Sequence, residues 1–145
     1  MRALHPVSIV LALSFSTLAV AQQFDGSVRM SCTVTSGFDC LPGNSSCGPI
    51  KRESNIEPVF KIDVAKKQVR SPFRTSLLPI SHSASSDVML VLQGGELKFA
   101  WSGLIKKATG EMTITVADTK GAYVVFGQCK LAEAPADSGT KQGAN

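Results

Sequence analysis

The feature that most constrains the fold is an alternation of apolar and polar residues across residues 96–130. Apolar residues fall at every second position in two runs, Leu97, Phe99 and Trp101, and then Met112, Ile114 and Val116. A period of two places one face of a strand in a core. The segments Lys107–Gly110 and Asp118–Gly121 each end in a glycine, which accepts positive φ and closes a tight hairpin. We therefore predict three consecutive antiparallel strands, the last of which ends near Cys129.

Shorter segments upstream follow the same pattern. The Val- and Thr-rich segment Ser27–Thr35 predicts a first strand, and residues 58–70 predict a hairpin with Phe60 and Ile62 on one face. A further strand pair is predicted at Leu77–Ser81 and Val88–Leu92, with a loop at His82–Ser86 between them and a turn at Gln93–Gly95. Residues 36–55 are rich in Gly, Pro, Asn and Ser and predict an irregular loop. No segment predicts a helix.

About eight short strands joined by tight turns indicate an all-β fold. We predict an antiparallel meander that curls into a small closed or half-open barrel, so that the first and last strands meet. A sandwich of two sheets built from the same strands is the alternative, because strand order cannot be read from one sequence.

The first 21 residues are typical of a secretory signal peptide. Arg2 precedes an apolar run, Val7–Val20, and the small residues Ala19 and Ala21 fit a signal-peptidase site. We predict cleavage after Ala21, periplasmic or secreted localisation, and no transmembrane segment after cleavage; an uncleaved N-terminal anchor is the alternative. The remaining 124 residues suffice for one domain, which we place at residues 22–130. Residues 131–145 have few bulky apolar side chains and predict a disordered tail.

All four cysteines lie after the predicted cleavage site, which indicates a disulfide framework in an oxidising compartment. Of the three possible pairings we favour Cys40 with Cys47 across a turn-rich loop, which leaves Cys32 to pair with Cys129. A metal site is disfavoured, since there is no C-x-x-C pair and His82 is the one histidine outside the signal peptide. We expect no metal and no cofactor.

Charge suggests one candidate surface. The chain without its signal peptide has a net charge of about +3, and it lacks the dense basic stripe with interleaved aromatics that is typical of nucleic-acid binding. Basic residues gather around the predicted hairpin, where Lys66, Lys67 and Arg70 could contact an anionic envelope component or an acidic protein partner. Alternatively they form a solvated face that discourages edge pairing.

Catalytic machinery is not indicated. The segment Ser81–Asp87 contains serine, histidine and aspartate, but seven residues of one loop cannot supply a triad on separate elements with an oxyanion hole. We interpret it as a solvated turn. The acidic residues lie in turns or on polar strand faces, with no sign of a convergent carboxylate pair. We therefore expect a protein that is not an enzyme.

Trp101 and Tyr123 are the only residues of their kinds and both lie on predicted strands. Each can either pack in the core or line a pocket for an apolar ligand, because small barrels hold at most one small ligand. We list both as possible binding residues.

The segments FKID, KKQV, WSGLIKKATGEM and FGQC, together with the early cysteine pair, resemble small, uncharacterised secreted bacterial proteins. The resemblance covers most of residues 28–130 and implies a lipocalin-like β-barrel, with no catalytic residue to carry over. Cys32, Trp101–Gly103 and Cys129 also resemble bacterial inhibitors of C-type lysozyme. The second pair, Cys40 and Cys47, departs from that pattern, and so does the lack of a lipid-attachment cysteine.

These observations predict a non-catalytic exported module that binds or interacts with a component of the bacterial envelope. One alternative is a small inhibitor of a hydrolase such as lysozyme, with residues 40–47 as the protruding loop. The other is a carrier of a small apolar ligand, which requires space inside the barrel. The sequence identifies no particular ligand, partner or oligomeric state.

Overall fold

Every regular element in the described part of the chain is a β-strand. A computed structural model describes residues 23–43, 46–51 and 57–132, and within these ranges it contains ten strands and no helix. The strands are β1 Met30–Cys40, β2 Gly48–Pro49, β3 Val59–Asp63, β4 Gln68–Arg70, β5 Leu77–Pro79, β6 His82–Ser85, β7 Met89–Glu96, β8 Phe99–Lys106, β9 Glu111–Asp118 and β10 Ala122–Leu131. The predicted signal peptide, its cleavage site and residues 133–145 of the predicted tail lie outside the described residues.

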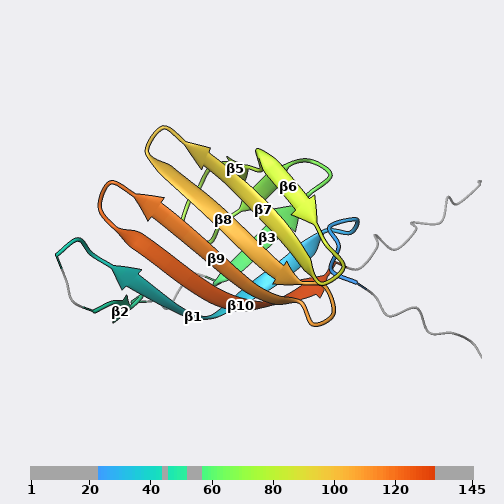
Figure 1. The fold of residues 1–145 in the computed structure, drawn as a ribbon, viewed down its shortest axis with the longest axis horizontal. Helices are drawn as coiled ribbons and strands as arrows, with labels where there is room; N and C mark the ends of the chain where they lie inside the picture. The colour runs from blue at the N-terminus through green and yellow to red at the C-terminus, as the bar shows by residue number, and fades with distance from the viewer. Residues whose placement is uncertain (1–22, 44–45, 52–56, 133–145) are drawn as a thin grey trace, which may run out of the picture.

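The strands form one antiparallel sheet that curls on itself. Nine strands follow the order β5-β4-β3-β1-β10-β9-β8-β7-β6, and β2 pairs with β1 beside this path. Figure 1 shows β3 and β5 lying behind β7 to β10, as expected for a half-open barrel. The predicted all-β antiparallel meander is confirmed. No helix in the described ranges has the length and apolar character needed to cross a membrane.

The two edge strands, β5 and β6, are separated by only Ile80 and Ser81. The Ile80 N–H donates a hydrogen bond to the Lys67 carbonyl at 2.9 Å, whereas the Ser81 N–H donates to the Gln93 carbonyl in β7, also at 2.9 Å. The chain therefore steps from one edge of the sheet directly to the other. We call the contact between residues 79–81 and 93–94 the seam, because it is where the curled sheet meets itself.

The first and last strands pair along most of their length. Cys32 lies opposite Cys129 in the β1–β10 ladder, and the two form a disulfide. A second disulfide joins Cys40 to Cys47. Both predicted pairings are confirmed, and the described chain has no free cysteine. Two disulfides are consistent with an oxidising compartment.

The core lies inside the curl and follows the period-two pattern. Six of the inward residues predicted on β3, β8 and β9 are buried, at 2–6% exposure, and the seventh, Val116, is partly buried against the core. The six buried residues are Phe60, Ile62, Phe99, Trp101, Met112 and Ile114. Alternation therefore identified the buried face of three strands correctly.

The turn between β7 and β8 was predicted in the wrong place. Gln93–Gly95 belongs to β7, and the chain turns at Leu97 and Lys98, so that Glu96 pairs with Phe99. Leu97 is 106% exposed and takes no part in the core. The later turns agree with the prediction, but only Gly110 takes a positive φ, of 73°. A side chain at Gly121 would instead lie 2.6 Å from the Cys40 carbonyl oxygen.

Two other segments also differ from the prediction. His82–Ser85 is not a loop but strand β6, which pairs with β7, while β5 pairs with β4. The first strand does not end at Thr35: after a bulge between Val34 and Ser36 it continues to Cys40, paired with β10 and β2. Pairing with neighbouring strands forms β6 and the second half of β1, although neither segment has an alternating apolar pattern in its sequence. At the other end, β10 extends to Leu131, one residue past the predicted domain boundary.

The two ends of the barrel differ. Phe24 packs against the core at the end that carries the β8–β9 turn, and its N–H donates to the Lys107 carbonyl at 3.0 Å. A side chain at Gly110 would lie 2.7 Å from the Phe24 ring. We call this the closed end, on the right of Figure 1. The other end carries the β7–β8 and β9–β10 turns and the 71–76 loop.

Phe24→Ala is expected to destabilise the domain by about 1 to 2 kcal/mol, since a half-buried aromatic ring leaves the core. The measurement is equilibrium unfolding in urea. Val28→Ala, which removes an exposed side chain from the same segment, serves as the control. Equal losses in the two variants would show that the Phe24 ring does not close the barrel.

Candidate functional site

Trp101 and Tyr123, both predicted as possible binding residues, lie on one inward row of the sheet. Tyr123 is opposite Val116 in the β10–β9 ladder, and Val116 is opposite Trp101 in the β9–β8 ladder. Their environments differ, however. Tyr123 is half-buried near the end of the barrel opposite Phe24, whereas Trp101 is 5% exposed.

Trp101 packs at the seam. A Cβ atom at Gly94 would lie 2.6 Å from Trp101 Nε1, so the glycine makes room for the indole ring. The Nε1–H group has no hydrogen-bond partner among the described residues. Trp101 lines none of the hollows described below, so its principal role is core packing.

A hollow of about 350 Å³ opens at the end of the barrel opposite Phe24. We call it the mouth. Most of its walls are apolar side chains from the barrel interior and the adjoining loops: Ile50, Phe60, Phe73, Leu78, Phe99, Val116 and Val125. The Phe60 and Phe73 rings meet edge to face, with centroids 5.9 Å apart. Tyr123 also lines the mouth, so the sequence identified one of its residues.

Polar groups occupy the rim of the mouth. The Arg74 guanidinium lies over the Phe99 ring, 3.9 Å from its centroid, which is a cation–π geometry. The buried Ser71 hydroxyl oxygen accepts a hydrogen bond from the Phe73 N–H at 3.1 Å. Asp118 accepts bonds from the Lys120 and Gly121 N–H groups, which holds the β9–β10 turn. Sequence spacing does not connect Arg74 with this rim, because its neighbours there come from distant strands.

A second hollow, of about 400 Å³, lies on the outer face of β1, β3 and β4 toward the closed end. Its cationic side chains are Arg29, Lys61, Lys66 and Arg70, with Asp63 as the one acidic residue among those that line it. We call it the basic hollow. The structure thus places Lys66 and Arg70 in the lining of one hollow, and Lys67 is not among the lining residues. Arg29 was missed because β1 is remote in sequence from the hairpin.

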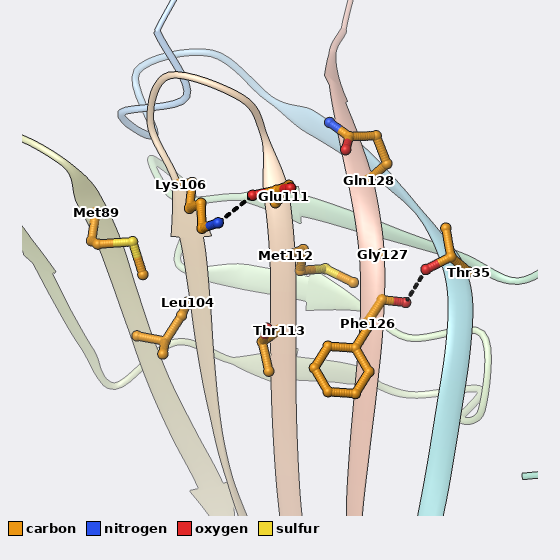
Figure 2. Close-up of a pocket in the computed structure, with 10 residues that line it drawn as sticks. All are labelled: Thr35, Met89, Leu104, Lys106, Glu111, Met112, Thr113, Phe126, Gly127 and Gln128. Carbon is orange, nitrogen blue, oxygen red and sulfur yellow. Dashed lines mark hydrogen bonds and ion pairs between the residues drawn. The ribbon is translucent and has the colours of Figure 1, made fainter. Parts of the chain in front are cut away.

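A third hollow, of about 410 Å³, lies on the outer face of β7 to β10. Figure 2 shows Leu104, Thr113 and Phe126 side by side across three strands, as their register requires. Leu104 and Phe126 are each 39% exposed. This outer hollow places the apolar side chains of Leu104 and Phe126 beside polar ones such as Lys106 and Gln128.

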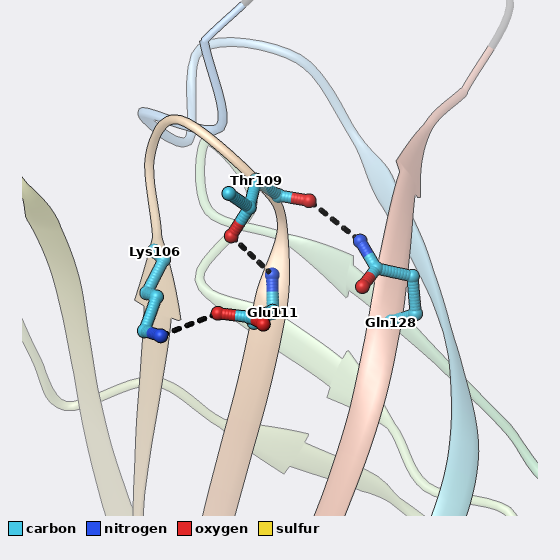
Figure 3. Close-up of polar contacts among 4 residues, drawn as sticks. All are labelled: Lys106, Thr109, Glu111 and Gln128. Carbon is cyan, nitrogen blue, oxygen red and sulfur yellow. Dashed lines mark hydrogen bonds and ion pairs between the residues drawn. The ribbon is translucent and has the colours of Figure 1, made fainter.

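The rim of the outer hollow is held by polar contacts, shown in Figure 3. Lys106 forms an ion pair with Glu111, and Gln128 Nε2 donates to the Thr109 carbonyl at 2.6 Å. The hydrogen bond and the charge of Lys106 lower the pKa of the exposed Glu111 carboxyl. Glu111 is therefore held as a carboxylate and is poorly suited to act as a general acid near neutral pH.

The segment 81–87 consists of edge strand β6 and the start of a turn. His82 lies on the exposed edge strand β6, and the Ser86 hydroxyl accepts hydrogen bonds from the backbone of Val88 and Met89. The turn is thus confined to Ser86–Val88, shorter than predicted. Among the described residues no group of three or more His, Cys, Asp or Glu side chains could hold a metal ion.

The predicted inhibitory loop begins where β1 ends. The Cys40–Cys47 disulfide fastens its base, and β2 pairs with β1 directly after it. Leu41, at its start, is 48% exposed. Residues 44–45 lie outside the described residues, so the tip of the loop provides no geometry for a site.

The three hollows offer different chemistry. The mouth is an apolar hollow with a cation at its rim, the basic hollow concentrates positive charge, and the outer hollow is an apolar row between polar groups. Comparison of the chain with protein-family models, with curated proteins and with solved structures finds no match.

Proposed function

We propose that this protein is a non-catalytic, exported binding protein of the bacterial envelope that takes a small apolar ligand into the mouth of its barrel. The observation that carries the proposal is the hollow of about 350 Å³, walled largely by apolar side chains from the barrel interior and the adjoining loops. Ligand pockets are usually preformed, mostly apolar and equipped with a few polar groups. The mouth meets each of these conditions.

The size of the mouth favours a small ligand. A volume of about 350 Å³ is near the lower end of the range for ligand pockets. Four of its lining side chains, from Phe60, Phe73, Phe99 and Tyr123, are aromatic. Aromatic walls favour flat rings, which pack edge to face or offset against them. We therefore propose a ligand with an aromatic or similarly compact apolar body.

The rim of the mouth suggests how such a ligand is oriented. Arg74 is exposed, lies over the Phe99 ring and lines the mouth. An acidic group on the ligand would pair with Arg74 while the apolar body contacts Phe60 and Phe73. The ligand would then be an apolar acid whose carboxylate remains near solvent.

Export is part of the proposal. The N-terminal signal pattern and the two disulfides together support a periplasmic or secreted location. The physiological ligand would be a small molecule of the envelope or its surroundings.

The proposal predicts that the protein binds anthracene carboxylate, with a change in Trp101 fluorescence as the readout, because Trp101 neighbours the Val116 wall. Phe73→Ala should weaken binding about fivefold, since it removes part of an apolar wall. Leu97→Ala is the matched control: Leu97 is also an exposed apolar side chain, but it lies in a turn outside the mouth. It should bind as the wild type does.

Arg74 provides a separate test of orientation. Arg74→Gln should weaken anthracene carboxylate about tenfold, because a charge-assisted hydrogen bond is lost. The same variant should bind the neutral probe aminoanthracene unchanged. Failure of both probes to bind wild-type protein, or equal losses in the Phe73 and Leu97 variants, would refute the mouth as a ligand site.

A further inference from the structure

The basic hollow is a second site, remote from the mouth and independent of the function proposed for it. We propose that it binds a ligand carrying two or more neighbouring phosphate groups. Four cationic residues line it: Arg29, which immediately precedes β1, Lys61 of β3, Lys66 of the β3–β4 turn and Arg70 of β4. The hollow faces outward near the closed end of the barrel.

The strand register places two of these cations side by side. Lys61 lies directly opposite Arg70 in the β3–β4 ladder, and Ser31 and Leu77 continue the same outward row on β1 and β5. Neighbouring strands are about 4.8 Å apart, so the two side chains leave the sheet close together. Like charges directly opposite each other destabilise a strand pair. An anion bridging Lys61 and Arg70 would turn this repulsion into attraction.

The local acidic group does not neutralise the cations. Asp63 Oδ1 accepts a hydrogen bond from the Lys66 backbone N–H at 2.9 Å, which fastens the β3–β4 turn. Within the described ranges, no carboxylate lies in ion-pair contact with Arg29, Lys61, Lys66 or Arg70. Among the described residues, no ion pair therefore neutralises their positive charge.

The shape of the surface favours a compact multivalent anion. A hollow of about 400 Å³ is large enough to surround several oxyanions from more than one side. Its edge is fixed by the Ala132 N–H, which donates to the Arg29 carbonyl at 2.7 Å. Arginine binds phosphate through a planar fork and lysine acts as a point charge, so the two types together suit neighbouring phosphates.

The test is isothermal titration with tripolyphosphate, using the wild type and the double variant Lys61→Gln, Arg70→Gln. We expect wild-type binding that weakens as salt rises, and at least a tenfold loss in the double variant. The control is Lys98→Gln, Lys120→Gln, which removes two exposed turn lysines away from the hollow. It should bind tripolyphosphate like the wild type.

Thermal unfolding distinguishes binding at the basic hollow from a general effect of the protein's net charge. Without ligand, the double variant should melt at or above the wild-type temperature, because a like-charge pair has been removed. With tripolyphosphate, only the wild type and the control should gain stability. Equal loss of binding in the two double variants, or no binding by the wild type at low salt, would overturn the proposal.

Vesicles distinguish the source of the phosphates. Cardiolipin carries two phosphates per lipid. Wild-type binding to vesicles that contain cardiolipin, absent with phosphatidylcholine alone, displaced by tripolyphosphate and lost in the Lys61, Arg70 variant, would assign the site to phospholipid headgroups. Binding of tripolyphosphate without binding to either vesicle would assign it to a free oligophosphate. Probe binding at the mouth should persist in this variant, so failure of either site can be recognised separately.

Discussion

Removal of the Cys32–Cys129 disulfide by a double alanine substitution is expected to lower the free energy of unfolding by about 4 to 5 kcal/mol. The bridge closes a loop with a sequence separation of 97, so its loss gives the unfolded chain a large increase in conformational freedom. Both half-cystines are buried in the core, and a small packing loss adds to the effect. Domains of this size are stable by only about 5 to 15 kcal/mol, so the variant should be close to unfolding at room temperature.

The second disulfide is the internal control. Cys40 and Cys47 are separated by only seven positions and lie at the end of β1. Replacing both by alanine should cost about 2.5 kcal/mol on the same loop-entropy argument. Equilibrium unfolding in urea measures the two variants. A larger loss in the Cys40, Cys47 variant, or equal losses, would contradict the assignment of Cys32–Cys129 as the main covalent staple.

The disulfide pairing and the strands of residues 96–130 were predictable because the information is local. A short turn-rich loop favours Cys40 with Cys47, and elimination then pairs Cys32 with Cys129. Alternation around Phe99 and Met112 reports burial on one face, which the structure confirms. The β7–β8 turn was less predictable because two glycines lie inside a strand, and Leu97 followed the apolar pattern while lying in the turn.

The seam could not be predicted because tertiary pairing forms it. Strand β6 is exposed on both faces, so His82–Ser85 has no apolar pattern to distinguish it from a loop. Its hydrogen bonds come from β7, and the switch from β5 to β6 depends on both edges of the sheet meeting. The extension of β1 to Cys40 has the same origin, since β10 and β2 supply its partners.

The residues of the candidate sites could be predicted only in part from the sequence. Tyr123 was selected because it is the single tyrosine, and Lys66 and Arg70 because they belong to a local basic run. The mouth, however, combines Phe60, Arg74 and residues of β9 and β10, which no spacing rule connects. The basic hollow likewise gains Arg29 through the β1–β3 ladder. Sites at barrel ends and on sheet faces depend on register, which single sequences specify weakly.

Gly94→Ala is expected to open the seam and to cost about 3 kcal/mol or more, at the upper end of overpacking effects. The added Cβ would lie 2.1 Å from the Pro79 carbonyl oxygen and 2.6 Å from Trp101 Nε1. The first of these is a backbone atom of β5 that cannot rotate away, so β5 and β7 must separate. Loss of this contact releases the hydrogen bond from the Ser81 N–H to the Gln93 carbonyl.

Gly103→Ala is the matched control, because Gly103 is another strand glycine whose added Cβ would lie next to Trp101. Its added Cβ would meet Ile114, Trp101 and Leu92 at 3.5 to 4.0 Å, which is ordinary van der Waals contact. That variant should be nearly as stable as the wild type or slightly more stable, since alanine reduces the freedom of the unfolded chain. Urea unfolding compares the two variants, and amide hydrogen exchange at Ser81 reports the seam directly. If Gly94→Ala left both its stability and the protection of the Ser81 amide at wild-type values, β5 and β7 would not meet in solution, and the barrel would be open along that edge.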